Sequence, residues 1–83
     1  MRTEKANNHR TPAEDYTIAN ELYRIRRSNG LSQERLAEMI GVDVKTVGRW
    51  ERAEISIFNA SYGTVMRLIE VLGPECATLL RSA

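Results

Sequence analysis

Three cations recur at intervals of four and three residues in the segment VKTVGRWER, namely Lys45, Arg49 and Arg52. On a helical wheel at about 100° per residue they lie within about 60° of one another, and Val47 and Trp50 lie on the opposite side. Ammonium and guanidinium groups on one helix face can bind phosphates and the edges of guanine bases. The same pattern also occurs on solvated helix faces that bind nothing, so the chemistry depends on what positions this helix.

The remaining residues offer no reaction chemistry. No paired carboxylates, nucleophile–base set or glycine-rich phosphate loop is present, so we do not expect an enzyme or any catalytic residue. Cys76 is the only cysteine, which excludes an internal disulfide, and His9 stands alone in a polar stretch. We therefore expect no metal and no cofactor, and we interpret Cys76 as a small apolar filler.

Length and charge narrow the class of protein. A chain of 83 residues is expected to form one small domain, for which a second subunit is the expected supplement to a marginal core. The net charge of +1 is uninformative, but its distribution is uneven. Between positions 24 and 52 there are seven basic residues and only four acidic ones. The polar N-terminus MRTEKANNHR and the absence of a long apolar run predict a cytoplasmic protein without a membrane span.

Cap and turn signals divide the chain into helices. Residues 1–10 are polar and predict a disordered tail, and residues 11–83 predict a single domain. The sequence TPAE starts a first helix, from about Pro12 to Ser28, in which Thr11 is the cap. Ser32 caps a second helix that stops at Gly41, and Asp43 caps a third that runs to about Arg52.

The second half of the chain continues the helical pattern. Alternation from Ile55 to Ile57 favours a short extended piece. Asn59 or Ser61 then caps a fourth helix, and a fifth runs from about Pro74 to Arg81. The inner face of the fourth helix is formed by Val65, Leu68, Ile69 and Leu72. These elements predict an all-α fold, a compact bundle of about five helices.

The segment LSQERLAEMIGVDVKTVGRWE, residues 31–51, resembles the helix-turn-helix of Cro/phage-repressor-type (XRE-like) transcriptional regulators. The resemblance covers about residues 21–72 and implies a lambda-repressor-like DNA-binding domain. The family often has a glycine just after the third helix, where this chain has Ala53, so we do not carry over the phosphate contacts of that loop. The matching residues are Gln33, Leu36-Ala37, Gly41-Val42, Val47 and Trp50-Glu51, preceded by LYRIRRSNGLS.

The resemblance implies roles for individual residues. The residues that would contact base edges are Val44, Lys45 and Arg49. Arg49 would donate hydrogen bonds to guanine, and Val44 would pack against a thymine methyl group. Arg26 and Glu51 occupy positions where the family often has a partly buried ion pair. The candidates for phosphate contacts are Gln33, Thr46, Arg52 and Asn59, and those for a dimer interface are Val71, Leu72, Leu79 and Leu80.

Together these features predict a sequence-specific DNA-binding regulator, a homodimeric autorepressor that reads an inverted repeat in double-stranded DNA. Small members of this family act as phage regulators, antitoxins or regulators encoded beside anti-CRISPR genes, so a toxin is one kind of protein partner. A nucleoid-associated location in a prokaryotic or phage system follows. The alternative is a protein-interaction module that keeps the fold but no longer binds DNA, which the near-neutral charge favours.

Overall fold

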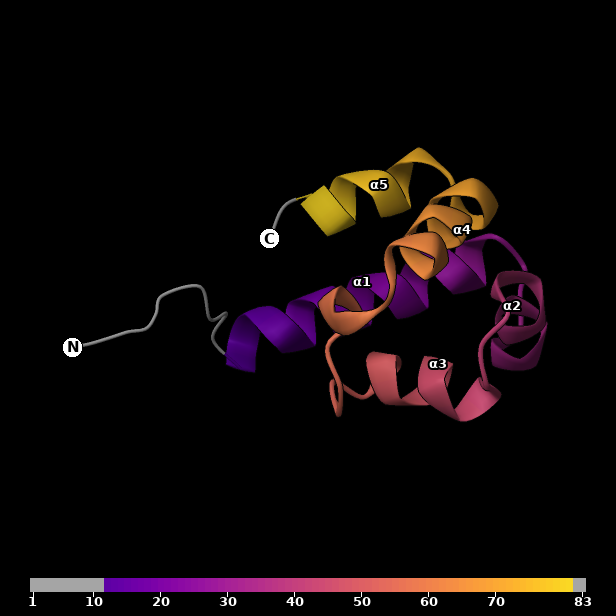
Figure 1. Ribbon diagram of the computed structural model, residues 1–83. Coiled ribbons are helices and arrows are strands. Elements are labelled where there is room, and N and C mark those ends of the chain that lie inside the picture. The colour runs from indigo at the N-terminus through magenta and orange to yellow at the C-terminus, as the bar shows by residue number, and fades with distance from the viewer. Residues whose placement is uncertain (1–11, 82–83) are drawn as a thin grey trace.

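The computed structural model describes residues 12–81. Helices account for most of this part of the chain, and it contains no strand (Figure 1). The predicted all-α fold is therefore confirmed. The expected tail at residues 1–10 and the expected cap Thr11 lie outside the described residues. The elements are α1 (Pro12–Ser28), α2 (Gln33–Ile40), α3 (Val44–Glu51), the 3-10 helix η1 (Ile57–Asn59), α4 (Tyr62–Leu72) and α5 (Pro74–Arg81).

Side-chain caps set the start of the two helices of the motif. The Ser32 hydroxyl accepts a hydrogen bond from the Arg35 N–H at 2.9 Å, and an Asp43 carboxylate oxygen accepts one from the Lys45 N–H at 2.8 Å. Gly41 has a φ of 77°, a left-handed conformation that glycine adopts without strain, and it ends α2. Only three residues separate α2 from α3 as a result, so the two helices are held in a sharp turn.

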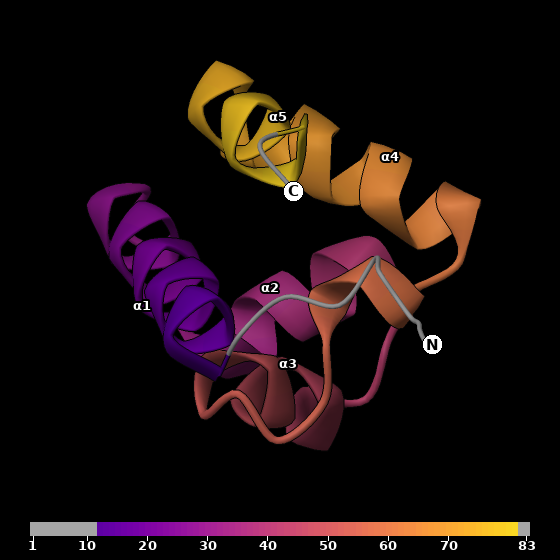
Figure 2. The same cartoon turned by 90° about the vertical axis from the view of Figure 1, so that its left-hand side faces the viewer.

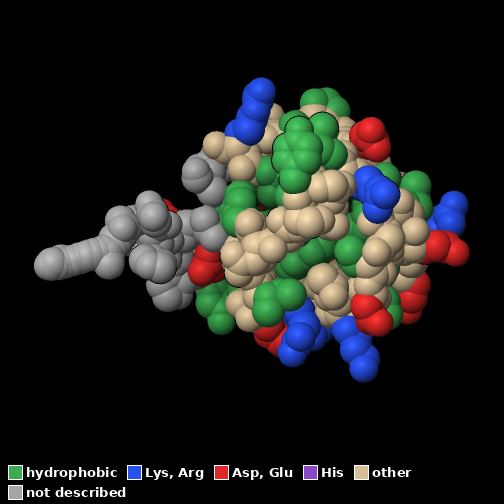
Figure 3. Space-filling view, viewed as in Figure 1, with side chains coloured by type: hydrophobic (Ala, Val, Ile, Leu, Met, Phe, Trp, Pro, Cys, Tyr) green, Lys and Arg blue, Asp and Glu red, His purple; other side chains and the backbone are tan. Residues whose placement is uncertain are grey.

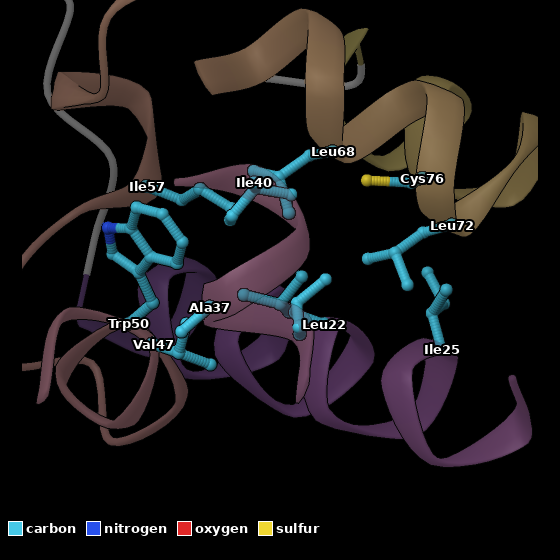
Figure 4. Packing of buried hydrophobic residues seen from close by; sticks show 11 residues of the cluster. Leu22, Ile25, Ala37, Ile40, Val47, Trp50, Ile57, Leu68, Leu72 and Cys76 are labelled. Atoms are coloured by element: carbon cyan, nitrogen blue, oxygen red, sulfur yellow. The ribbon is translucent and has the colours of Figure 1, made fainter. Parts of the chain in front are cut away.

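The apolar core lies between the five helices of the described region (Figure 4). Val47 and Trp50 fix α3 to this core, with relative exposures of 0% and 4%. Cys76 is fully buried, as expected of an apolar filler, and burial raises the pKa of its thiol to about 11. The buried cluster consists of Leu22, Ile25, Leu36, Ala37, Ile40, Val47, Trp50, Ile57, Leu68, Leu72 and Cys76.

The helices leave α3 at one side of the molecule. It packs against α1 and α2, whereas α5 packs against α1 and α4. Figures 1 and 2 show α3 at the bottom of the molecule and α5 at its top. One side of α3 therefore faces the core and the other faces solvent. None of the helices within residues 12–81 combines the length and the apolar character that crossing a membrane requires.

The connection between α3 and α4 differs from the prediction. The extended piece expected from Ile55 to Ile57 is shorter than predicted, because Ser56 is extended but η1 begins at Ile57. The Ser56 hydroxyl accepts a hydrogen bond from the Phe58 N–H at 3.1 Å and starts this turn, which places Ile57 in the core. Of the two predicted caps of α4, Ser61 is the one used; its hydroxyl accepts from the Thr64 N–H at 3.2 Å.

Candidate nucleic-acid interface

The outer face of α3 carries the predicted cations. Lys45 is exposed, and the side chains of Arg49 and Arg52 are 57% and 58% exposed. Lys and Arg side chains project from the lower edge of the molecule in Figure 3, where α3 lies in Figure 1. Val44, at the first position of α3, is exposed beside them. The expected sorting of α3 into a basic outer face and an apolar inner face is therefore present.

A Schellman motif ends α3. The Ala53 N–H donates to the Trp50 carbonyl at 3.2 Å, and the Glu54 N–H donates to the Arg49 carbonyl at 2.9 Å. Ala53 adopts the left-handed conformation that this motif requires, with a φ of 60°, and among the described residues it is the one non-glycine with a positive φ. Ala53 thus stands where the family often has glycine, and the left-handed turn forms with alanine in its place.

This turn brings Glu54 against Arg49 and Arg52, a contact that the sequence does not predict. Arg52 Nε donates to Glu54 Oε2 at 2.7 Å, and Arg49 Nε lies 3.8 Å from Glu54 Oε1. The hydrogen bond from Arg52 lowers the pKa of the Glu54 carboxyl below its usual value. The signal in the sequence is an acidic residue two positions after Arg52, but its meaning depends on the left-handed turn at Ala53.

A buried ion pair fixes α3 to α1. Arg26 Nε and Nη2 donate to the two carboxylate oxygens of Glu51 at 2.7 and 3.0 Å, and the two side chains are only 5% and 4% exposed. Arg26 Nη1 also donates to the Leu31 carbonyl at 2.7 Å. The hydrogen bonds to Glu51 raise the pKa of Arg26 above its usual value. The pair therefore holds the orientation of α3 relative to α1 and to the turn before α2.

The predicted phosphate contacts fall in separate places. Gln33 begins α2, and its Nε2 donates to Glu51 Oε1 at 2.9 Å, which joins it to the buried ion pair. Thr46 and Asn59 line a common groove between α3 and the start of α4, together with Ser61 and Thr64. The structure thus places polar groups on either side of the basic face of α3.

The predicted dimer residues lie on the other side of the molecule, on α4 and α5. Val71, Leu79 and Leu80 are partly buried at the edge of the core. Leu72 is only 4% exposed, so its side chain belongs to the core of the protomer and is not available to a second copy. Within residues 12–81, no cluster of His, Cys, Asp or Glu could hold a metal ion.

Comparison with known protein families agrees with this geometry. The family model HTH_3, described as helix-turn-helix, matches residues 22–74, which is more than half of the chain. The match includes α2, α3 and the turn between them. Comparison with curated proteins finds no match. The protein therefore belongs to the HTH_3 family of Cro/C1-type, XRE-like helix-turn-helix proteins and is a DNA-binding regulator.

Proposed function

We propose that the protein is a homodimeric repressor that binds an inverted repeat in double-stranded DNA, with α3 of each protomer in the major groove. The observation that carries this proposal is that α3 has one buried face and one exposed face. Val47 and Trp50 are buried, while Lys45 and Arg49 are exposed. A major groove about 12 Å wide accommodates a helix presented in this way.

Arg49 is the proposed reader of guanine. Its contact with Glu54 uses Nε, and within residues 12–81 its Nη1 and Nη2 donate no hydrogen bond. These two groups form the edge of the guanidinium that matches guanine O6 and N7. Lys45, one helical turn earlier, can reach a guanine edge or a phosphate, and Val44 can contact a thymine methyl.

Phosphate contacts on both sides of the major groove of the DNA would fix the register of α3. Gln33 uses one N–H of its amide for Glu51, and the second remains for a phosphate oxygen. Thr46 and Asn59 contribute a hydroxyl and an amide from the groove beside α4. Arg52 is a phosphate candidate as well, although it is paired with Glu54 in the free protein.

The proposed dimer forms through α4 and α5, around Val71, Leu79 and Leu80. These residues lie on the side of the molecule away from α3, so pairing there leaves both copies of α3 exposed. Occupying a promoter is the simplest way in which such a dimer represses transcription, including that of its own operon. Phage regulators, antitoxins with a toxin partner and anti-CRISPR-associated regulators, acting in the prokaryotic cytoplasm at the nucleoid, all fit this description.

The test compares Arg49→Ala with Arg24→Ala. Arg24 is also an exposed arginine paired with carboxylates, but it lies on α1 beside α5, so the variant removes the same charge away from α3. Titration against the upstream region of its own gene should show a loss of about 5- to 150-fold for Arg49→Ala, corresponding to about 1–3 kcal/mol. Affinity for random duplex should fall less. Arg24→Ala should bind both DNAs like the wild type.

Two results would contradict the proposed function. Equal losses on the upstream region and on random duplex would remove Arg49 from base reading. Failure of the wild type to bind either DNA at low salt would favour the alternative function, a protein-interaction module. The net charge of +1 and the pairing of Arg52 with Glu54 are the observations on the side of that alternative.

A further inference from the structure

An acidic group lies at the C-terminal end of the basic face of α3. Glu54 lies against Arg49 and Arg52, and its own side chain is 49% exposed, so the carboxylate stands on the surface that would meet DNA. A carboxylate at this place repels phosphates and occupies the cations that would bind them. Its position therefore calls for an explanation in terms of what α3 recognises.

We propose that Glu54 determines specificity: it holds Arg49 with its guanine-reading edge outward and keeps Arg52 from backbone phosphates. The inference rests on the proposed DNA-reading role of α3. In this arrangement, α3 gains little from phosphates of any sequence and retains its contact with the correct base. Discrimination between operator and other DNA would increase, because the non-specific part of the affinity is reduced.

The backbone places Glu54 for this role. In a Schellman motif, the second residue beyond the C-cap lies beside the third residue from the helix end, and the two commonly make an apolar contact. Here these two positions are Glu54 and Arg49, and the apolar contact is replaced by an ion pair at 3.8 Å. Because the motif is fixed by two backbone hydrogen bonds, the backbone of Glu54 has a defined position beside that of Arg49, which keeps the two side chains within reach of each other.

The contact with Arg52 is closer and has a different consequence. Arg52 Nε and Nη2 donate to the two oxygens of Glu54 at 2.7 and 3.4 Å. Arg52 Nη1 lies over Gly48, only 2.9 Å from the point where a Cβ atom would stand, so the guanidinium lies close to the helix. A phosphate on the Glu54 side of Arg52 would have to displace these hydrogen bonds, and one bound by the remaining N–H groups of Arg52 would be repelled by the ionised Glu54 carboxylate beside it.

Glu54→Gln removes the charge and keeps the size of the side chain. Glu21→Gln is the matched control, since Glu21 is 43% exposed, is paired with Arg24, and lies on α1. Each variant is titrated with the upstream region and with random-sequence duplex from 0.05 to 0.3 M salt, after its melting curve has shown that it folds. Glu21→Gln should leave both affinities and both salt slopes at wild-type values.

For Glu54→Gln, the release of Arg52 predicts one additional phosphate contact on random duplex. The log–log salt slope should become steeper by about 0.9, and affinity at 0.1 M salt should rise about 5- to 10-fold. The upstream region should gain less, so the ratio of specific to non-specific affinity should fall by about 5-fold or more. The same change in an Arg52→Gln background should no longer alter the slope.

Three results would overturn the inference. The first is that Glu54→Gln keeps the wild-type ratio of specific to non-specific affinity, and the second is that it leaves the salt slope unchanged. The third is that Glu54→Gln changes the slope equally in the Arg52→Gln background, which would indicate only a general effect of charge. These outcomes can be told apart from failure of the proposed function. That function fails if the wild type shows no preference for the upstream region, whereas this inference alone fails if the wild type has that preference and Glu54→Gln keeps it.

Discussion

A buried carboxylate, that of Glu51, fixes α3 to its neighbours in addition to the apolar side chains of Val47 and Trp50. Glu51 accepts three hydrogen bonds, two from Arg26 on α1 and one from Gln33 on α2. The remaining Nη1 of Arg26 is satisfied by the Leu31 carbonyl. Because the charges are paired and hydrogen-bonded, the cost of burying them is offset, but loss of either partner leaves a charge that water cannot reach.

Glu51→Ala should therefore destabilise the protein by about 3–5 kcal/mol, because Arg26 would remain buried without its counter-charge. Glu38→Ala is the control, since the Glu38 side chain is 71% exposed and its pair with Arg35 lies on the surface of α2. It should cost less than about 1 kcal/mol. Urea denaturation followed by the fluorescence of Trp50 measures both. Equal losses of unfolding free energy would show that the buried pair carries no special weight.

The turn that ends α3 places an alanine, Ala53, in a backbone conformation that favours glycine. The left-handed conformation costs an L-amino acid about 1–2 kcal/mol, and Ala53 bears this cost where the family often has glycine. Glycine would relieve the strain, although its greater freedom in the unfolded chain would return about 0.4–1 kcal/mol of the gain. The motif itself would remain, since its hydrogen bonds come from the backbone.

We accordingly expect Ala53→Gly to raise the unfolding free energy, by up to about 1 kcal/mol. Ala77→Gly gives the comparison, because Ala77 lies inside α5, where glycine should lower stability by about 1 kcal/mol. The urea midpoints of the two variants should move in opposite directions while the slopes stay constant. A fall in stability for Ala53→Gly would mean that the left-handed conformation is not strained.

The elements differ in how well the sequence predicts them. Ser32, Gly41 and Asp43 predict the limits of α2 and α3 because caps and left-handed turns act locally. The extended piece expected from Ile55 to Ile57 stops at Ser56, because two apolar residues at a spacing of two do not distinguish an extended segment from a 3-10 turn started by a serine cap.

The candidate site shows a similar limit. The helical wheel predicts the outward cations of α3, and the inner-face periodicity of α4 already places Leu72 with Leu68 in the core. The contact of Glu54 with Arg49 and Arg52 could not be predicted, because nothing in the residue types shows that Ala53 adopts a positive φ. Without that turn, a glutamate after a helix reads as an ordinary solvated residue.

The two proposed surfaces of the protein, the DNA-binding face of α3 and the dimer surface on α4 and α5, are separated. α3 lies at the bottom of the molecule and α5 at its top, so dimerisation through α4 and α5 does not cover the basic face of α3. Since α1 packs against both helices, and the Arg26–Glu51 pair joins α1 to α3, the core fixes the two surfaces relative to each other. A dimer built in this way would present two copies of α3 at a fixed spacing.

A fixed spacing makes operator binding depend on the distance between half-sites. A two-fold dimer with helices about 34–36 Å apart reads half-sites one helical turn apart. Insertion of about 5 base pairs between them moves the second half-site to the other face of the duplex, and an insertion of about 10 returns it to the same face. Wild-type affinity should therefore fall sharply with the first insertion, because only one protomer can bind.

Leu80→Glu tests whether α5 causes this dependence, because a charge at the edge of the core on α5 should prevent pairing of two copies. The variant should sediment as a monomer and bind the native and the lengthened operators with equal, weak affinity. Met66→Glu, at an exposed position of α4 outside the proposed interface, should remain dimeric and keep the wild-type dependence on spacing. If Leu80→Glu were dimeric and still sensitive to the spacing of the half-sites, the dimer interface would have to lie elsewhere. If the wild type bound the operator with the 5-base-pair insertion as tightly as the native one, the protein would not read its operator as a rigid dimer.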